Sequence, residues 1–329
     1  MAAYTAIDDP EAYFQTQLYT GTGSSLAVTL DGDTDMQPDF VWTKNRDESE
    51  GHQLFDAVRG ATKFLKSNNT DAEGTGAETL KSFDSDGFTV GTDADMNTSS
   101  ELNVAWCWKE SATAGFDIVG FAGNATNSDI AHSLSAVPEM MITKSRENAE
   151  NWGVYHQAVG NTHASYLNTT VVPTDEAAYY QDTTPTSSVF TVGTADATND
   201  DADMIAYLFA PKQGFSKFGS YPGNGNADGP FIYTGFKPAF VMFKETDSTS
   251  PWSMFDTKRD VDNVTHHRLE AQANNTEYTG SEMYHDILSN GFKLRTTDAE
   301  FNTSGGTYIY MAFAEQPFVN SNGVPCNAR

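Results

Sequence analysis

Three aspartates at alternate positions are the first residues whose spacing could serve a chemical role. Asp31, Asp33 and Asp35 surround Gly32 in an acidic loop, and carboxylate oxygens are the ligands that Ca²⁺ prefers. The loop lacks the distal Glu that would complete an EF-hand loop. Two interpretations therefore stay open at this stage, a calcium site and a solvated acidic turn.

Aromatic and basic side chains form a second candidate set. Exposed aromatic rings present apolar faces on which a sugar can stack, and cations pair with acidic groups of a glycan. The residues concerned are Trp42, Trp152, Trp252, Lys44, Arg46, Lys144 and Arg146. The alternative is structural. The tryptophans would then pack in a core, and the cations would pair with the acidic turn of their own module.

The sequence motifs of common enzymes are absent. The chain has no G-x-S-x-G elbow, no H-E-x-x-H and no phosphate-binding glycine loop. The adjacent pair His266 and His267 lies in a polar stretch, where simple exposure is the ordinary interpretation. Carboxylates are so abundant that spacing alone singles out no glycosidase pair. We therefore expect no enzymatic activity and no cofactor, apart from the calcium considered above.

Composition restricts the class of partner. The 329 residues include 45 acidic and 19 basic side chains, for a net charge of −26, whereas proteins that bind nucleic acid need basic surfaces. Hydrophobic residues make up 38% of the chain, enough for a folded core. The N-terminus lacks the features of a signal peptide, and no stretch is apolar enough to span a membrane. We expect a folded acidic protein, made in the cytoplasm, that binds no nucleic acid and does not insert into membranes.

Two cysteines are too few for a disulfide framework or a zinc knuckle. Cys107 and Cys326 lie far apart in the sequence, and neither has a close-spaced partner. We expect two free thiols, with Cys107 in a core strand.

An internal repeat must position all of these residues. Pro38, Pro138 and Pro238 follow one another at intervals of 100 residues, each within a similar nine-residue segment. Each copy opens with an aromatic-rich stretch, passes through a Gly-Phe or Val-Phe strand and closes with an apolar run. The opening and closing segments are 14–23, 116–124 and 215–225, and then 104–108, 205–209 and 309–313.

Each copy is typical of β structure. Short runs of β-branched and aromatic residues alternate with turn residues about every ten positions. The dipeptides at 86–87 and 290–291 predict hairpins, and the acidic stretches that follow the Phe strands (93–95, 196 and 298–300) predict structural turns. No apolar period of 3.6 residues lasts three turns, and the best helical candidate is 61–66.

The sequence therefore predicts an all-β chain of three tandem β-sandwich modules of the jelly-roll or concanavalin type, with about seven strands each. The predicted divisions are an N-terminal arm (1–13), modules at 14–112, 113–212 and 213–316, and a C-terminal tail (317–329).

Several motifs resemble a domain family of unknown function that occurs in virion proteins of marine tailed bacteriophages, some described as concanavalin A-like lectins or tail-fibre-like proteins. The motifs are PDFVWTKNR (38–46), LFDAVRG (54–60), SFDSDGF (82–88), VAWCWK (104–109), KFGSY (217–221) and GTYIYMAFAE (306–315). The resemblance extends from about residue 14 to residue 318. The chain departs from a self-contained tail fibre because it has no long N-terminal shaft or coiled coil.

The resemblance implies a structural protein on the surface of a phage virion, with no catalytic residues to carry over. The expected partners are other virion proteins, further copies of the chain in a trimer or ring, and a host-surface glycan that lectin-like modules would bind in adhesion. Two alternatives remain. One is a capsid or tail decoration subunit without a ligand, tied to its neighbours through its two termini. The other is a polysaccharide depolymerase, which would need a pair of facing carboxylates in a groove.

Overall fold

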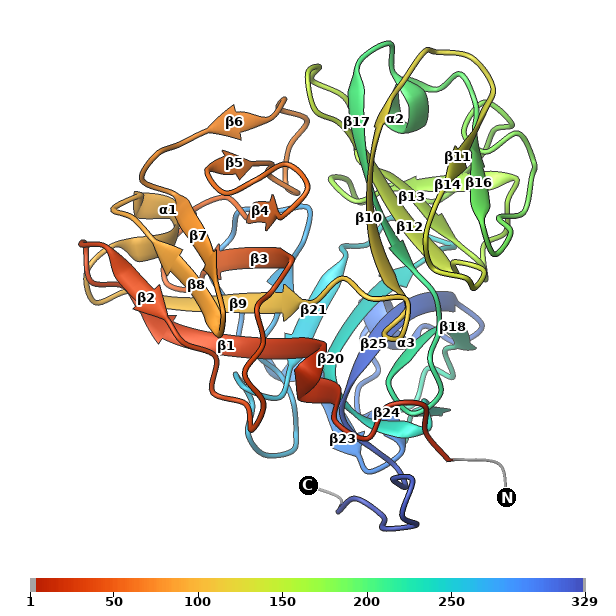
Figure 1. Ribbon diagram of the computed structural model, residues 1–329. Coiled ribbons are helices and arrows are strands. Elements are labelled where there is room, and N and C mark those ends of the chain that lie inside the picture. The colour runs from red at the N-terminus through yellow and green to blue at the C-terminus, as the bar shows by residue number, and fades with distance from the viewer. Residues whose placement is uncertain (1–3, 328–329) are drawn as a thin grey trace.

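Short strands separated by turns build almost all of the regular structure. The computed structural model describes residues 4–327, and within them the chain forms 25 strands, three single-turn α-helices and two 3-10 helices (Figure 1). The strands pair antiparallel in several open sheets. The prediction of an all-β fold is confirmed.

The first segment, residues 14–108, follows the 3-10 helix η1 (Pro10–Ala12). Its elements are β1 (Phe14–Thr20), β2 (Leu26–Val28), β3 (Phe40–Asn45), β4 (Gln53–Asp56), β5 (Lys63–Phe64), β6 (Gly74–Thr75), β7 (Leu80–Asp84), β8 (Gly87–Val90), α1 (Ala94–Asn97) and β9 (Leu102–Trp108). The large sheet has the order β1-β9-β3-β4 and the smaller sheet the order β2-β8-β7, while β5 pairs with β6.

The second segment, residues 116–209, has a six-stranded and a two-stranded sheet. Its elements are β10 (Phe116–Ala122), β11 (Ser128–Ala131), β12 (Met140–Ser145), β13 (Gly153–His156), β14 (His163–Tyr166), β15 (Thr174–Asp175), β16 (Val189–Val192), α2 (Asp196–Asn199) and β17 (Asp203–Phe209). The orders are β10-β17-β12-β13-β14-β15 and β11-β16.

The third segment, residues 216–317, has a five-stranded and a three-stranded sheet. Its elements are β18 (Ser216–Pro222), β19 (Phe231–Tyr233), β20 (Phe236–Glu245), β21 (Ser253–Asp256), β22 (Leu269–Glu270), η2 (Ser281–Met283), β23 (His285–Leu288), β24 (Gly291–Leu294), α3 (Ala299–Asn302) and β25 (Thr307–Pro317). The orders are β18-β25-β20-β21-β22 and β19-β24-β23.

The three large sheets share one order of strands. In each segment the first strand pairs with the last, and the last pairs with the strand that follows the repeated proline or, in β20, contains it. That strand pairs with the next one along the chain. The sequence divisions expected at 112/113 and 212/213 fall in the links from β9 to β10 and from β17 to β18.

The hairpins expected after the turn dipeptides form in the first and third segments, where β7 pairs with β8 and β23 with β24. Gly87 begins β8 with φ +113°, and a Cβ there would lie 2.0 Å from the Val28 carbonyl oxygen. Glycine is therefore needed at this position. The second segment lacks this glycine, and among the described strands β16 pairs with β11 alone.

The best helical candidate, 61–66, does not form a helix. Residues 63–64 form β5 instead, and Leu65 bridges to Leu54, so this stretch continues the sheet. Backbone hydrogen bonds to a neighbouring strand outweigh the weak helical preference of so short a stretch.

The helices lie in the acidic turns instead. Asp93 and Asp298 cap α1 and α3 by accepting hydrogen bonds from the backbone N–H groups of Asp95 and Glu300. The structural role predicted for these aspartates is confirmed at both positions.

The large sheets are buried on both faces. In the first segment one face packs on the smaller sheet through residues such as Phe55 and Phe88. The opposite faces of all three large sheets contribute to a single shared core. At its centre the rings of Trp108, Phe209 and Phe313, from the closing strand of each segment, lie 5.6 to 6.5 Å apart between centroids. The three segments therefore pack around a common apolar centre (Figure 1).

Both cysteines are free, and Cys107 is buried in β9 as expected from the sequence. Burial raises the pKa of the Cys107 thiol, so this side chain behaves as a small apolar residue.

Candidate functional site

The candidate tryptophans lie between the segments, where their rings are buried. The indole N–H of Trp152 donates to the Lys66 carbonyl of the first segment at 3.0 Å, and that of Trp252 donates to the Tyr166 carbonyl of the second at 2.9 Å. These rings present no face to solvent. The sugar stacking considered for them finds no support, and the alternative of core packing describes them.

A histidine of the first segment makes the equivalent contact with the third segment, so these contacts join all three segments in a cycle. His52 occupies the position equivalent to Trp152 and Trp252, and its Nε2 donates to the Glu270 carbonyl of the third segment at 3.0 Å. Its Nδ1 accepts the indole N–H of Trp42 at 2.8 Å. Burial lowers the pKa of His52, which keeps the ring neutral in this role. Each segment therefore bonds to its neighbour through one equivalent side chain.

The candidate lysines close turns of their own segments. Lys44 donates to the carbonyls of Asn45 and Glu48, and Lys144 donates to those of Ser145 and Asn148. Both side chains are fully buried, and burial lowers the pKa of each to about 8. Their ammonium groups are not exposed to a glycan.

Arg146 joins the second segment to the first. It forms two hydrogen bonds with the Glu73 carboxylate, at 2.9 and 3.2 Å. Glu73 also contacts the buried Arg59 at 3.5 Å, and Arg59 pairs with Asp56. The Asp56 carboxylate accepts the hydroxyl of Tyr207 from the second segment at 2.7 Å. Positive and negative side chains therefore alternate in a buried network between the first and second segments, in the order Arg146, Glu73, Arg59 and Asp56.

Arg46 begins an equivalent network between the first and third segments. It pairs with Glu277 at 2.7 Å, and Glu277 pairs with the buried Arg259 at 3.0 Å. Arg259 pairs with Asp256 at 2.6 Å, and Asp256 accepts the indole N–H of Trp106 at 3.1 Å. The expectation that these cations pair within their own module is wrong for Arg46, which pairs with Glu277 of the third segment. Arg146 pairs with Glu73 of the first segment and also with Asp203 of its own at 3.8 Å.

The second–third contact lacks these charges. The equivalent positions hold His156, Val159, Pro173, Thr246 and Met311. His156 donates from Nε2 to the Tyr310 carbonyl at 3.1 Å, and its Nδ1 accepts the Ala158 N–H at 3.2 Å. A neutral imidazole satisfies both bonds, whereas a second proton on Nδ1 would face a donor.

Acid is therefore expected to weaken this contact. Burial lowers the pKa of His156 from 6.5 to about 4. The stability that the neutral ring contributes is present above pH 6.5 and is lost as the pH falls toward 4, because the unfolded chain takes up the proton first. The loss amounts to about 2–3 kcal/mol between pH 7 and pH 4.5.

Urea unfolding at several pH values tests this expectation. His156→Gln retains a donor for the Tyr310 carbonyl but does not titrate, so its stability should fall less with acid than that of the unsubstituted chain. The buried His52 and His285 are present in both proteins, so their contributions to the pH dependence of stability cancel in the comparison. Identical pH profiles for the two proteins would contradict the assignment.

A cavity of about 510 Å³ opens at the second–third contact. Glu139 and Gln157 line it from the second segment, Lys217 and Tyr233 from the third, and Tyr4 from the N-terminal arm. The Lys217 ammonium donates to the Tyr233 carbonyl at 2.6 Å and lies 5.5 Å from the centroid of the Tyr233 ring. Of the five cavities compared, the one at the second–third contact, where the described residues form no ion pair, has the largest volume.

The cavity combines aromatic faces with polar groups. Tyr4 is 61% exposed and Tyr233 is 53% exposed, so both rings are open to solvent at its rim. Burial raises the pKa of Glu139 and lowers that of Lys217, and each group's charge opposes the other's shift. Flat apolar rings beside a carboxylate and an ammonium suit a ligand with an apolar face and hydroxyl edges.

One family model accounts for most of the chain. The family is described as a domain of unknown function, DUF7483, and its model matches residues 9–317. The chain belongs to the DUF7483 family. A search of curated proteins finds no match to it.

The DUF7483 chain does not bring its three candidate calcium ligands together. Asp31 pairs with Lys258 at 2.7 Å, while the backbone N–H groups of Gly32 and Asp33 donate to Gln15 and Glu11. A metal site needs at least three His, Cys, Asp or Glu residues whose ligand atoms lie close together. Among residues 4–327, Asp31, Asp33 and Asp35 belong to no group of three whose ligand atoms lie within 4.8 Å of one another. The loop has the form of an acidic turn, and calcium binding stays a prediction.

The residues around the cavity were not singled out by the sequence. Glu139 lies within a repeated segment, and Lys217 lies in one of the family-like motifs, but neither position differs in type from many other surface residues. A comparison of equivalent positions in the three repeats would have shown that the second repeat has the uncharged Val159 where the others have Arg59 and Arg259.

Within residues 4–327, no helix of this DUF7483 chain is long and apolar enough to cross a membrane.

Proposed function

We propose that this DUF7483 chain is a non-enzymatic structural protein on the surface of a tailed-phage virion, where it serves as an appendage or decoration and adheres to a host-surface glycan. The observation that carries the adhesion role is the cavity at the second–third contact, with the open rings of Tyr4 and Tyr233 beside Lys217 and Glu139. The virion location rests on the motifs that resemble phage structural proteins.

We also propose that the three sets of sheets are β-sandwich modules related by the internal repeat, with the jelly-roll or concanavalin type as the closest description. The common strand order of the three large sheets supports this proposal, as does the pairing of large and small sheets around buried residues such as Phe55 and Phe88. The modules correspond to residues 14–112, 113–212 and 213–316.

Two features favour adhesion over the alternatives. Among the described residues that line the cavity, Glu139 is the one carboxylate, whereas a depolymerase of the usual kind needs a pair. The chain ends also bind to their own chain. The Ala6 N–H donates to the Gln213 carbonyl at 3.0 Å, and the Ser321 N–H donates to Asp8 at 2.7 Å. These segments are therefore already engaged and have fewer groups to offer a neighbouring subunit.

Glycan-array binding by the purified chain tests the proposal. We expect binding to a defined set of glycans and a loss of about ten- to thirtyfold in affinity for Tyr233→Ala, because an exposed aromatic anchor contributes strongly to such sites. Lys217→Ala should weaken binding of acidic glycans more than that of neutral ones.

Tyr278→Ala is the matched control. Tyr278 is another exposed aromatic residue of the third segment, at 43% exposure, but it lies outside the cavity lining. Its replacement should leave glycan binding unchanged. The adhesion role would be ruled out by an array without binding, or by equal losses for Tyr233→Ala and Tyr278→Ala.

A further inference from the structure

The loop from β21 to β22 is longer than its counterparts. Leu269 pairs with Met254, whereas Leu65 and Ser165 pair with Leu54 and Val154, so the third segment has four more residues between the paired positions than the other two. Asp260 stands where the other segments have Gly60 and Gly160, and the additional residues come between Asp260 and the pair His266 and His267. This arrangement occurs in the third segment alone.

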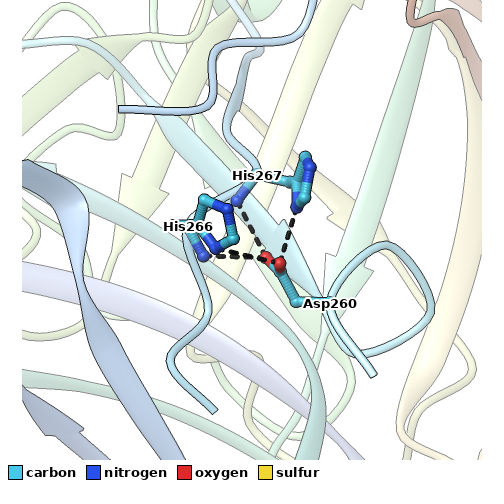
Figure 2. Close-up of side chains that lie close together, drawn as sticks. All are labelled: Asp260, His266 and His267. Carbon is cyan, nitrogen blue, oxygen red and sulfur yellow. Dashed lines mark hydrogen bonds and ion pairs between the residues drawn. The ribbon is translucent and has the colours of Figure 1, made fainter. Parts of the chain in front are cut away.

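The loop brings three side chains with metal-binding atoms together (Figure 2). The Nδ1 atoms of His266 and His267 lie 3.1 and 2.6 Å from Oδ1 of Asp260. One ligand atom from each residue lies within 4.8 Å of the other two, and this is the one such group among residues 4–327. Two imidazoles and a carboxylate form a common donor set for divalent transition metals.

Backbone contacts hold the group in place. Oδ2 of Asp260 accepts the N–H groups of His266 and His267 at 2.7 and 2.8 Å, which fixes the direction of Oδ1. The Thr265 N–H donates to the His285 carbonyl at 2.8 Å, and this bond anchors the loop against β23. The two Nδ1 atoms contact Oδ1 of Asp260, and that of His266 also lies 3.2 Å from the Val264 carbonyl. A metal ion would therefore replace the protons in these contacts, on residues whose backbone is already held in place.

Exposure also suits a cation. The Asp260 side chain is 4% exposed and lies beneath the two imidazoles. The imidazoles are 32% and 25% exposed and leave an open side for entry.

We propose that Asp260, His266 and His267 bind a divalent transition-metal ion, with Zn²⁺ as the representative ion. Nδ1 of each histidine and Oδ1 of Asp260 supply three ligands, and each ring then carries its N–H on Nε2. The remaining coordination positions face the open side, where water or a polar ligand group completes the shell. This site is separate from the glycan cavity and does not depend on the adhesion role.

Calorimetric titration of the full chain with ZnCl₂ at pH 7.5 tests the proposal. We expect one Zn²⁺ per chain, and a loss of at least about tenfold in affinity for His266→Gln, for His267→Gln and for Asp260→Asn. His132→Gln and His163→Gln are matched controls at partly exposed histidines outside the group, and they should bind Zn²⁺ as the unsubstituted chain does.

Electron paramagnetic resonance of the Cu²⁺-loaded chain identifies the ligands directly. The unsubstituted chain should show coupling to two nitrogen atoms, and each histidine variant should lose one. This spectrum tests the site even if a variant fails to fold. The proposal is overturned if Zn²⁺ does not bind saturably, if nitrogen coupling is missing, or if His132→Gln weakens binding as much as His266→Gln.

Discussion

Replacing Asp256 with alanine is expected to lower the free energy of unfolding by about 3–5 kcal/mol, since the change leaves a buried cation without its partner. The Asp256 carboxylate accepts hydrogen bonds from the Arg259 side chain at 2.6 Å and from the Trp106 indole at 3.1 Å. Arg259 is fully buried and cannot turn to water. Glu277 would remain as its one carboxylate partner in this network.

A double variant separates the ion pair from general disruption. Asp256→Ala with Arg259→Met removes both charges, and we expect it to be less destabilised than Asp256→Ala alone. The second segment already holds His156 and Val159 at these positions, so an uncharged pair is compatible with this fold. Urea unfolding followed by tryptophan fluorescence and circular dichroism measures both variants. The explanation fails if the single variant loses less than about 1 kcal/mol or if the double variant is the weaker of the two.

Trp108→Ala is expected to cost about 3–5 kcal/mol, because it opens a cavity where the three large sheets meet. The Trp108 ring lies 4.9 Å from that of Phe14, 5.3 Å from that of Phe40 and 5.6 Å from that of Phe313, between centroids. The side chain is 2% exposed. Residues from all three segments would lose contacts at once, since Phe209 of the second segment also packs on this ring, and the surrounding sheets can collapse only in part.

Phenylalanine variants test whether packing or hydrogen bonding dominates at the two neighbouring tryptophans. Among the described residues the indole N–H of Trp108 has no hydrogen-bond partner, so Trp108→Phe should retain most of the stability that Trp108→Ala loses. Trp106→Phe removes a donor from the buried Asp256 and should cost about 1–3 kcal/mol more than Trp108→Phe. Equal losses for the two phenylalanine variants in urea unfolding would contradict this view.

Local features of the fold followed from the sequence because their causes lie within a few residues. The hairpin at 86–87 requires a positive φ that glycine supplies, and the aspartates at 93 and 298 cap helices through a backbone N–H two residues away. The helical candidate 61–66 forms no helix because Leu65 bridges to Leu54, on a strand that local propensity does not take into account.

The sequence predicted the candidate site much less well than it predicted the local fold. The sequence marked Arg46 and Arg146 as unusual cations, but their partners Glu277 and Glu73 lie 231 and 73 positions away. Spacing within one repeat cannot reveal a partner in another. The cavity forms because Glu139 and Gln157 of the second segment lie beside Lys217 and Tyr233 of the third, and this depends on how the segments pack.

The sequence by itself determined that this chain is acidic and all-β, that its motifs recur about every 100 residues, and where its longer strands and hairpin turns fall. These properties arise from composition and from periodicity over short stretches of chain. Only the tertiary structure decided which side chains remain open to a ligand. The mostly apolar run at 39–43 predicts a buried strand, and β3 is buried along its length, but the run does not indicate which residues cover it. Packing of the three segments placed Trp152 and Trp252 in the interior and left Tyr4, Tyr233 and the histidine pair accessible, because burial depends on contacts between residues that are far apart in the chain.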